Sequence, residues 1–477
     1  MDGFLVQALD RLPLAEAVLL TLRHCWDDSF LDDLYARHRG RCYEDRVDFS
    51  TLVQIVCEAL LRDQGTAHKP IRRAIDDGRL LAACSSTYQK LGRTPLTLSM
   101  AFLRECTPRL EALLPEAAAQ LASRVPECLS GFGVIAFDGK TLKHVARRLK
   151  PLRAVRGKML GGKLLVALNL CSGLVLAMNA EPDAFRNDAA LVDGLLEQLP
   201  ADPDHPSLFI GDRQFCDLRL MALIADNRHE HFIIRHNKSV DFVRDSASAA
   251  SEGTDAGGRR YTDEIGWLGA QGNKKRRRVR RITLYRPGQE AISIITDLFD
   301  QQAYPAEQLL AAYLERWGIE QVFQKVTEVF SLKHLIGTTP KATIFQAAFC
   351  LVLYNVAQLI KTHIACAAQK ELQQISTQKL FDDACEQLSS FMLLAHSARS
   401  VITALDHRLG RSASIQMLRK RLTRRLAQVW TNWWTKSPTR PRPPTTTPKR
   451  YARSGRASVH RLLEEYRIKH KLHRPRT

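Results

Sequence analysis

The sequence predicts a mixed α/β core that is interrupted by a β-rich insertion and flanked by all-helical regions. Between residues 131 and 237, short apolar runs that end in Asp-Gly or Gly-Asp alternate with helical patterns. A Ser-, Gly- and Arg-rich segment with strand patterns follows, up to residue 300. Apolar residues at helical spacing dominate residues 1–128 and 346–436.

These patterns divide the chain into six predicted segments. They are a helical N-terminal domain (1–128), the first part of the core (129–237), a β-strand insertion (238–300), the second part of the core with a carboxylate-bearing helix (301–345), a helical C-terminal region (346–436) and a basic, largely disordered tail (437–477).

Within the core, the chain order predicts strand, strand, strand, helix, strand, helix, strand. The first strand covers residues 134–137 and is expected to end at Asp138. The next two strands flank Ser172-Gly173, which is a hairpin signal. A later strand ends in Gly211-Asp212. We expect the first three strands to be antiparallel, and the helix crossover to place the fourth parallel to one of them.

The stretch YLERWGIEQVFQK (313–325) predicts a helix with two different faces. The core-facing stripe consists of Ile319, Val322, Phe323, Val326, Val329 and Phe330. The other stripe carries Tyr313, Arg316, Trp317, Glu320, Gln324 and Thr327. Arg316 and Glu320 stand four residues apart, so a plain ion pair on the helix surface is the alternative to a functional role.

Three carboxylates form the candidate catalytic site. If the two strands lie side by side, Asp138 and Asp212 converge at the sheet, and the helix brings Glu320 to the same point. Hard oxygen ligands of this kind suit magnesium, and two such ions activate an attacking water or 3′-hydroxyl. Taken singly, an Asp followed by Gly is also a common turn signal.

The charge distribution favours a polyanionic partner. The net charge is +20, and residues 419–477 hold 18 Lys or Arg against two acids, which gives +16. Clustered charge of this sign is typical of nucleic-acid contact, although a solvated tail is the alternative. Eleven dispersed cysteines, none in a CxxC spacing, indicate free thiols in a reducing cytoplasm. The apolar stretch at 347–360 is too short for a membrane span and predicts a buried helix.

The segments around the three carboxylates resemble those of DDE transposases of bacterial insertion sequences, specifically the insertion-sequence-four type. "IAFDGKT" is similar to the block with the first Asp, which is Asp138 here. "LFIGDRQFCD" is similar to the second block and "YLERWGIEQVFQKVTEVFSLKHLIG" to the third, with Asp212 and Glu320. The resemblance covers about residues 131–345 closely and the flanking regions more loosely.

The resemblance implies a ribonuclease-H-like fold with a β-strand insertion before the last catalytic helix. It implies an enzyme that cleaves the ends of its insertion sequence and joins them to target DNA, with two Mg²⁺ ions, for which Mn²⁺ substitutes. The implied partners are double-stranded DNA, as terminal inverted repeats and as target, and a second copy of the chain on that DNA. We expect the helical N-terminal domain to bind the DNA ends, and we expect no membrane. The implied location is the bacterial cytoplasm, at the nucleoid.

The family signature in the third block is Tyr, two residues, Arg, three residues, Glu, six residues, Lys. Tyr313, Arg316 and Glu320 match it, but the Lys position holds Thr327. The resemblance implies that Tyr313 and Arg316 contact DNA phosphates near the cut. Two lysines stand on either side of Thr327 and are also candidate DNA contacts: Lys325 and Lys333.

The predicted insertion supplies further candidate DNA contacts. Trp267 could stack on a base expelled from the DNA end, as in related proteins, or simply pack on its strand. The basic run from 274 to 281 is expected to line the DNA path, with the candidates Lys274, Lys275, Arg276, Arg277 and Arg278. Two other functions remain open: a catalytically silent, transposase-derived DNA-binding protein, and another ribonuclease-H-like magnesium nuclease.

Overall fold

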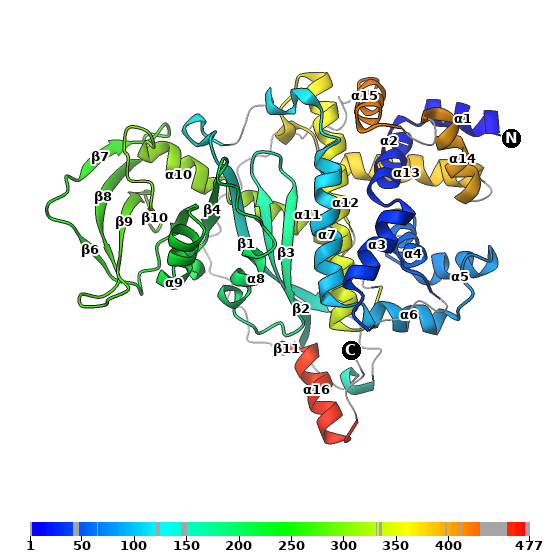
Figure 1. Ribbon diagram of the computed structural model, residues 1–477, viewed down its shortest axis with the longest axis horizontal. Helices are drawn as coiled ribbons and strands as arrows, with labels where there is room; N and C mark the ends of the chain where they lie inside the picture. Colours follow the sequence, from blue (N-terminus) through cyan, green and yellow to red (C-terminus); the bar gives the residue numbers. More distant parts are fainter. Residues whose placement is uncertain are drawn as a thin grey trace.

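The computed structural model describes most of the chain and shows a mixed sheet flanked by helices (Figure 1). The described residues are 2–41, 47–63, 65–120, 125–144, 150–153, 155, 157–330, 332, 336–395, 398–409, 413–429 and 456–472.

Helices form the N-terminal region, as predicted. They are α1 (Asp2–Arg11), α2 (Pro13–Cys25), α3 (Asp28–His38), α4 (Phe49–Leu61), α5 (His68–Asp76), α6 (Cys84–Arg93) and α7 (Leu96–Glu111), followed by the 3₁₀ turns η1 (Glu116–Gln120) and η2 (Glu127–Leu129). Asp27 and Asp48 cap α3 and α4 by accepting from the backbone N–H groups of Phe30 and Thr51. Helix α7 packs on β3, which α12 and α8 also contact.

Five strands form the core sheet: β1 (Gly133–His144), β2 (Lys158–Asn169), β3 (Val175–Glu181), β4 (Ser207–Gly211) and β5 (His231–Arg235). The strands β1, β2 and β3 are joined as an antiparallel meander, and β4 lies parallel to β1 and to β5. The resulting strand order, β3-β2-β1-β4-β5, is that of a ribonuclease-H-like sheet. The predicted order of these strands along the chain, the antiparallel pairing of the first three and the parallel pairing of the fourth are therefore confirmed.

Two details of the predicted core are wrong. Strand β1 does not end before Asp138, because it stays paired with β2 well beyond it, from Asp138↔Val166 to His144↔Met159. The helix predicted between the third and fourth strands is a 3₁₀ turn (η4, Asp188–Leu191) followed by the short α8 (Val192–Leu196). The connection from β4 to β5 contains α9 (Leu218–Ala222) and a π-helical turn (η6, Leu223–Asn227).

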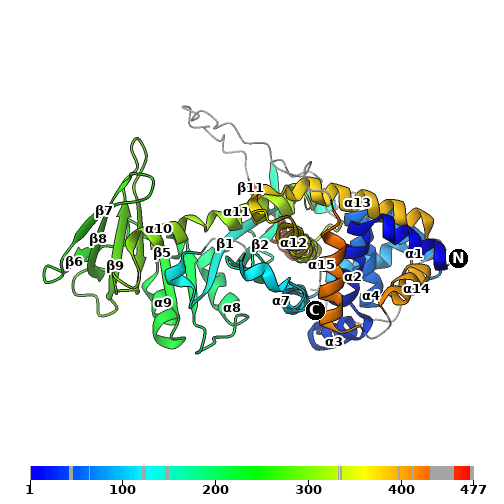
Figure 2. The ribbon, with the colours of Figure 1, turned by 90° about the horizontal axis from the view of Figure 1, so that it is seen from above.

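The insertion consists of strands, as predicted, and it extends the core sheet. Its strands are β6 (Phe242–Arg244), β7 (Ser251–Thr254), β8 (Arg260–Leu268), β9 (Arg277–Leu284) and β10 (Ile292–Thr296). Strand β10 pairs antiparallel with β5, and β9 and β8 follow in order. The insertion is thus continuous with the sheet that carries the candidate site, and both views place it at the opposite end of the molecule from α1–α6 (Figures 1 and 2).

The helix predicted over 313–325 is divided between two helices. Helix α10 (Ala306–Leu314) ends at a tight turn, and α11 (Trp317–Glu328) begins directly after Arg316. In this turn the N–H groups of Arg316, Gly318 and Ile319 bond to carbonyls only three residues earlier. The predicted apolar stripe is confirmed along α11 and just beyond its end, with Ile319, Val322 and Phe330 fully buried.

The remaining helices are α12 (Pro340–Ala368), the 3₁₀ turn η7 (Leu372–Gln374), α13 (Thr377–Leu394), α14 (Ala398–Leu409) and α15 (Ile415–Leu426). By length and composition α12 could cross a membrane. Its most apolar segment is, however, wholly buried inside the protein, as the predicted buried helix requires. It is longer than expected. Its Asn355 is also buried, and it donates to the Val175 carbonyl at 2.8 Å and accepts from the Val175 N–H at 2.8 Å.

Part of the tail expected to be disordered is folded. Strand β11 (Arg456–Ser458) pairs parallel with β2, and α16 (Val459–Lys469) follows it directly. The reason is a small apolar cluster in which Val459 is buried against Leu152 and Met159. The part of the predicted tail between 437 and 455 lies outside the described residues.

Candidate active site

The two aspartates of the candidate site come from neighbouring strands in matching register. Strands β1 and β4 are parallel, and Ala136 pairs with Ile210. Asp138 follows Ala136 by two residues, and Asp212 follows Ile210 by two residues. The register therefore places the two aspartates at the same level of the sheet. Asp212 follows the end of β4 as predicted, whereas Asp138 is a strand-interior residue.

Gly139 is required by a close approach on the far face of β1. A Cβ atom built at Gly139 would lie 2.3 Å from the Cγ of Asp188, which is far too close for two carbon atoms. Asp188 is held there by Lys163, whose Nζ lies 2.7 Å from its Oδ1. The Asp-Gly pair therefore does not make a turn in this chain, because the glycine instead gives room to a buried ion pair behind Asp138.

Glu320 and Arg316 reach the sheet from the N-terminal end of α11. The buried apolar stripe of α11 fixes which side of the helix faces the sheet, so that its first turn lies over β1. The Arg316 guanidinium then lies between two carboxylates. Its Nη1 is 3.3 Å from Oδ2 of Asp138, and its Nη2 is 3.4 Å from Oε1 of Glu320. Arg316 is only 5% exposed, so it is not the plain surface ion pair of the alternative interpretation.

Asp212 belongs to the same electrostatic cluster. Burial by itself would lower the pKa of Arg316, but Tyr313, Asp212 and Asp138 raise it above its usual value. Among the described residues, Arg235 at the end of β5 pairs with Asp212, with Nη1 3.8 Å from Oδ1. This Oδ1 atom is buried and has no hydrogen-bond partner among the described residues.

The local environment disfavours the ionised form of Asp138. Burial raises its pKa to about 6, and the nearby charges of Asp212 and Glu320 add to that rise. The Gly139 N–H, 2.8 Å from Oδ1, and the Arg316 guanidinium act in the opposite direction. Such a perturbed carboxyl group in a cluster of acids is typical of a functional site.

The donor set fits a hard divalent cation. Asp138, Asp212 and Glu320 supply carboxylate oxygens only, which are the ligands that magnesium prefers. The raised pKa of Asp138 and the unpartnered Oδ1 of Asp212 both indicate negative charge that is incompletely compensated. In the described part of the chain, no three His, Cys, Asp or Glu side chains already stand close enough together to hold a metal ion.

Lys140 also faces this cluster, although the sequence did not single it out. It lies two residues after Asp138 on β1, so both side chains are on the same face. Its Nζ is 5.5 Å from the centre of the Phe323 ring on α11. Burial and the charge of Lys143 lower its pKa, while Asp138, Glu320 and Glu328 raise it. The two-residue strand period after Asp138 is the signal that would have found it.

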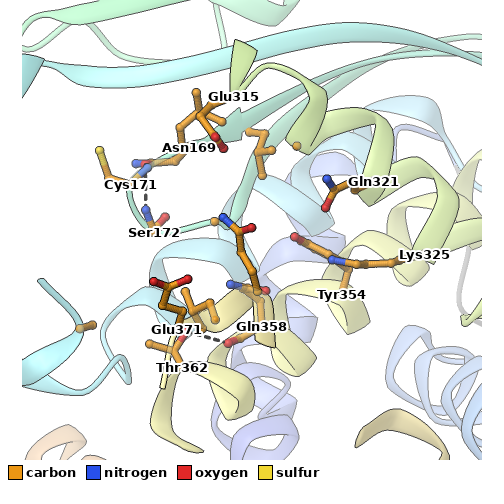
Figure 3. Close-up of a pocket in the computed structure, with 17 residues that line it drawn as sticks. Asn169, Cys171, Ser172, Glu315, Gln321, Lys325, Tyr354, Gln358, Thr362 and Glu371 are labelled. Carbon is orange, nitrogen blue, oxygen red and sulfur yellow. Dashed lines mark hydrogen bonds between the residues drawn. The ribbon is translucent and has the colours of Figure 1, made fainter. Parts of the chain in front are cut away.

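The other predicted DNA contacts of α10 and α11 are placed differently. Tyr313 is buried, and burial raises the pKa of its hydroxyl. Lys325 follows Glu320 by five residues, which is roughly 140° around a helix, so it points elsewhere. It lines a separate cavity of about 330 Å³ between the β2–β3 turn, α11 and α12 (Figure 3). Its Nζ lies 5.7 Å from the centre of the Tyr354 ring. Lys333 lies outside the described residues.

In the insertion, the predicted basic run begins in a turn and continues along β9. Lys274, Lys275 and Arg276 are exposed, and the Arg276 guanidinium lies 4.6 Å from the centre of the half-buried Trp267 ring. Arg277 pairs with Asp226, and Arg278 lies 3.7 Å from an oxygen of Asp245. The run is therefore a continuous basic stretch only in sequence, because its later members are partly neutralised by acids.

Part of the chain is similar to a known protein family. Residues 130–356, slightly less than half of the chain, match the family model described as the transposase DDE domain. This segment contains all three carboxylates, and its similarity supports a DDE transposase. No curated protein matches the chain. Among solved structures, one similar chain is that of the piggyBac transposase in a synaptic complex with hairpin DNA, at 10% identity and a TM-score of 0.40. The match covers 83% of this chain and 85% of that one.

Proposed function

We propose that the protein is a DNA transposase of the insertion-sequence-four type, which cleaves the ends of its own element and joins them to target DNA. The observation that carries this proposal is the gathering of Asp138, Asp212 and Glu320 around the buried guanidinium of Arg316. These residues come from two adjacent strands and a helix within the segment that matches the transposase DDE domain.

In this proposal Asp138, Asp212 and Glu320 hold two Mg²⁺ ions, or Mn²⁺ in their place. Bound there, such ions supply Lewis-acid stabilisation of phosphate charge and an activated attacking oxygen. The raised pKa of Asp138 means that binding of a cation at its carboxylate releases a proton near and below pH 6.

Arg316 has two roles in the proposal. In the absence of other cations its guanidinium balances Asp138 and Glu320. A guanidinium also binds phosphate oxygens in a bidentate manner, so Arg316, with Tyr313 beside it, is well placed for the phosphate at the cut. Its nearly complete burial restricts it to one orientation, which suits a positioning role.

The chemistry of the proposal is hydrolysis followed by transesterification. Water attacks the phosphodiester at the end of the element, the bond to the 3′-oxygen breaks, and a free 3′-hydroxyl results. That hydroxyl then attacks a phosphodiester of the target and displaces its 3′-oxygen. Because two ends must be joined together, we propose a homodimer on DNA, with the helical region of residues 1–128 binding the terminal inverted repeats.

A cleavage assay tests the proposal. Purified protein is incubated with a plasmid that carries the DNA flanking its gene, with Mg²⁺ or with EDTA. Asp212→Ala is compared with Asp193→Ala, a half-exposed aspartate on α8 that pairs with Arg219. We expect metal-dependent cuts at the borders of the element, which are lost in Asp212→Ala and kept in Asp193→Ala, with DNA binding retained in both.

The alternatives give different results in the same assay. Cleavage by Asp212→Ala within about tenfold of the wild type, a difference of about 1.4 kcal/mol, contradicts the assigned site. Binding without any cut, by a chain with Thr327 at the signature Lys position, indicates a silent DNA-binding protein. Preferential cleavage of RNA or branched DNA indicates another magnesium nuclease with the same fold.

A further inference from the structure

The carboxylate cluster contains a cation whose hydrogen-bonding capacity is unused. Lys140 is half-buried on β1, on the face that carries Asp138. Its side chain passes over the Phe323 ring of α11, which restrains the ammonium group at 5.5 Å from the ring centre. Unlike the side chain of Arg316, the side chain of Lys140 forms no hydrogen bond or ion pair with any residue that the structure describes. Its three N–H donors are therefore available to a ligand.

The position of Lys140 relative to α11 identifies the part of the site that it serves. Phe323 stands between Glu320 and Thr327 along the helix, so the ammonium group lies beside the turn that links them. Thr327 offers no charge there, and its hydroxyl donates to the Phe323 carbonyl oxygen at 2.7 Å. The cation at this turn thus comes from the strand and not from the helix.

A ligand for this ammonium group must be an anion that approaches three carboxylates. Asp138, Asp212 and Glu320 repel a DNA phosphate, and the single charge of Arg316, which Asp138 and Glu320 share, offsets only part of that repulsion. A compact ammonium group next to the cluster offsets that repulsion and provides point-charge binding of a phosphate oxygen. Arg235 is on β5, which is separated from β1 by β4. It pairs there with Asp212 and Glu290.

We propose that Lys140 binds a backbone phosphate of the DNA next to the cleaved bond, and supplies from β1 the positive charge that α11 lacks at Thr327. This inference rests on the proposed DNA cleavage at the same site. It assigns a substrate contact to a residue outside the signature of the third block.

The test compares Lys140→Met with a matched loss of charge on the same strand. Lys143→Met is the control, because Lys143 is an exposed residue of β1. Lys140→Arg keeps the charge. The substrates are duplexes from the DNA that flanks the gene, in which single phosphates are replaced in turn by neutral methylphosphonates. Cleavage with Mg²⁺ and equilibrium binding without metal are both measured.

We expect Lys140→Met to slow cleavage by about 10- to 100-fold, the usual effect of losing a charge-assisted hydrogen bond. Lys143→Met should stay within about threefold of the wild type, and Lys140→Arg should recover most of the loss. At one phosphate, the methylphosphonate should weaken binding and cleavage by the wild type but cause no further loss in Lys140→Met. That lack of additivity identifies a direct contact, because two independent losses multiply.

Three outcomes overturn the inference. One is a Lys140→Met variant that cleaves and binds as well as Lys143→Met. Another is a full additional loss in Lys140→Met at every substituted phosphate. The third is weaker Mn²⁺ binding by Lys140→Met, which indicates a structural role, since removing a positive charge beside carboxylates should leave metal affinity unchanged or higher. If the wild type never cleaves but the interference pattern appears in binding, the contact between Lys140 and a DNA phosphate stands, and the proposed cleavage function fails.

Discussion

Arg316 and Asp138 stand 178 positions apart in the chain, and the guanidinium Nη1 lies 3.3 Å from the carboxylate Oδ2. This contact connects the start of helix α11 to strand β1. It compensates only part of the local negative charge, because the pKa of Asp138 is still raised to about 6. The candidate site is therefore a place where the fold holds carboxylates together against their repulsion, and this has measurable consequences for stability.

The first prediction is that Asp138→Asn stabilises the metal-free protein at neutral pH. A carboxyl group whose pKa is higher in the folded state than in the unfolded state binds its proton more tightly when folded. Its contribution to stability is therefore favourable at low pH and is lost as pH rises from about 4 to about 6. Removing the charge should add about 1–3 kcal/mol to the free energy of unfolding at pH 7.5.

Thermal melting in EDTA at pH 7.5 and pH 5 measures this effect. Asp193→Asn serves as control, because Asp193 is half-exposed on α8 and pairs with Arg219, an interaction worth little. We expect a higher melting temperature for Asp138→Asn at pH 7.5 and a smaller gain at pH 5. A lower melting temperature at pH 7.5 would show that the Arg316 contact outweighs the cost of burial.

A second prediction concerns Gly139→Ala. The added methyl group would lie 2.3 Å from Cγ of Asp188, so either β1 or the Asp188–Lys163 pair must move. Overpacking of this kind costs about 1–3 kcal/mol. Because Asp138 is the adjacent residue, we also expect slower cleavage. Gly131→Ala is the matched control, since nothing lies within 4 Å of its added Cβ. Equal stability of the two variants would contradict the tight packing behind Asp138.

The outcome for the two aspartates shows which parts of the site the sequence can predict. Asp212 is found at the end of its strand because β4 is short and its pairing with β1 ends at Ala136↔Ile210. Asp138 is not at a strand end, because pairing with β2 continues to His144, and such pairing depends on residues 15 to 28 positions away. The carboxyl-to-guanidinium contacts of Arg316 and the position of Lys140 over Phe323 depend likewise on tertiary packing.

The basic run of the insertion shows the same limit. Arg280 belongs to the run from 274 to 281 in the sequence, yet it is fully buried and makes a bidentate pair with Asp263, at 2.9 and 2.7 Å. Its Nη1 also donates to the carbonyl oxygens of Leu298 and Tyr304. Nothing in the run itself distinguishes this arginine from its exposed neighbours, because its partner lies on the adjacent strand β8.

The third prediction follows from that pair. Arg280→Met leaves Asp263 buried without its counter-ion, which costs about 3–5 kcal/mol. Arg278→Met, whose side chain is 51% exposed, should cost less than about 1 kcal/mol. Melting temperatures of the two variants make the comparison. Similar values would mean that the buried pair contributes no more than a surface arginine.

A fourth prediction separates DNA contact from structural roles in the insertion. Lys274 and Lys275 are exposed in the turn before β9. If both contact phosphates, replacing both by Gln should reduce the slope of log affinity against log salt by about 2. Arg260→Gln is the control, because Arg260 pairs with Glu252 on the neighbouring strand. An unchanged slope in the double variant would remove this turn from the DNA path.

The last prediction concerns His363, which ties α12 to both flanking helical regions. Its Nε2 lies 2.9 Å from the Leu113 carbonyl oxygen and its Nδ1 lies 3.2 Å from the Thr423 hydroxyl. Burial lowers its pKa to about 4, with a further contribution from Arg419. The folded protein therefore holds it neutral, and the unfolded chain takes up a proton first as pH falls. Stability present above about pH 6.5 is lost toward pH 4, by up to about 3 kcal/mol.

The pH windows of His363 and Asp138 overlap, and their effects have opposite signs. On acidification, protonation of Asp138 stabilises the folded state, whereas protonation of His363 in the unfolded chain destabilises it. In the wild type these two changes in stability partly cancel. The effect of His363 is therefore isolated in the Asp138→Asn variant. Its melting temperature is measured between pH 7.5 and pH 5, with and without the additional substitution His363→Gln. We expect a steep loss of stability on acidification when His363 is present and a shallower loss when it is replaced by Gln. The His363→Gln variant should also be less stable at pH 7.5, because the buried hydrogen bonds are altered. Parallel curves would show that His363 is not the group that responds.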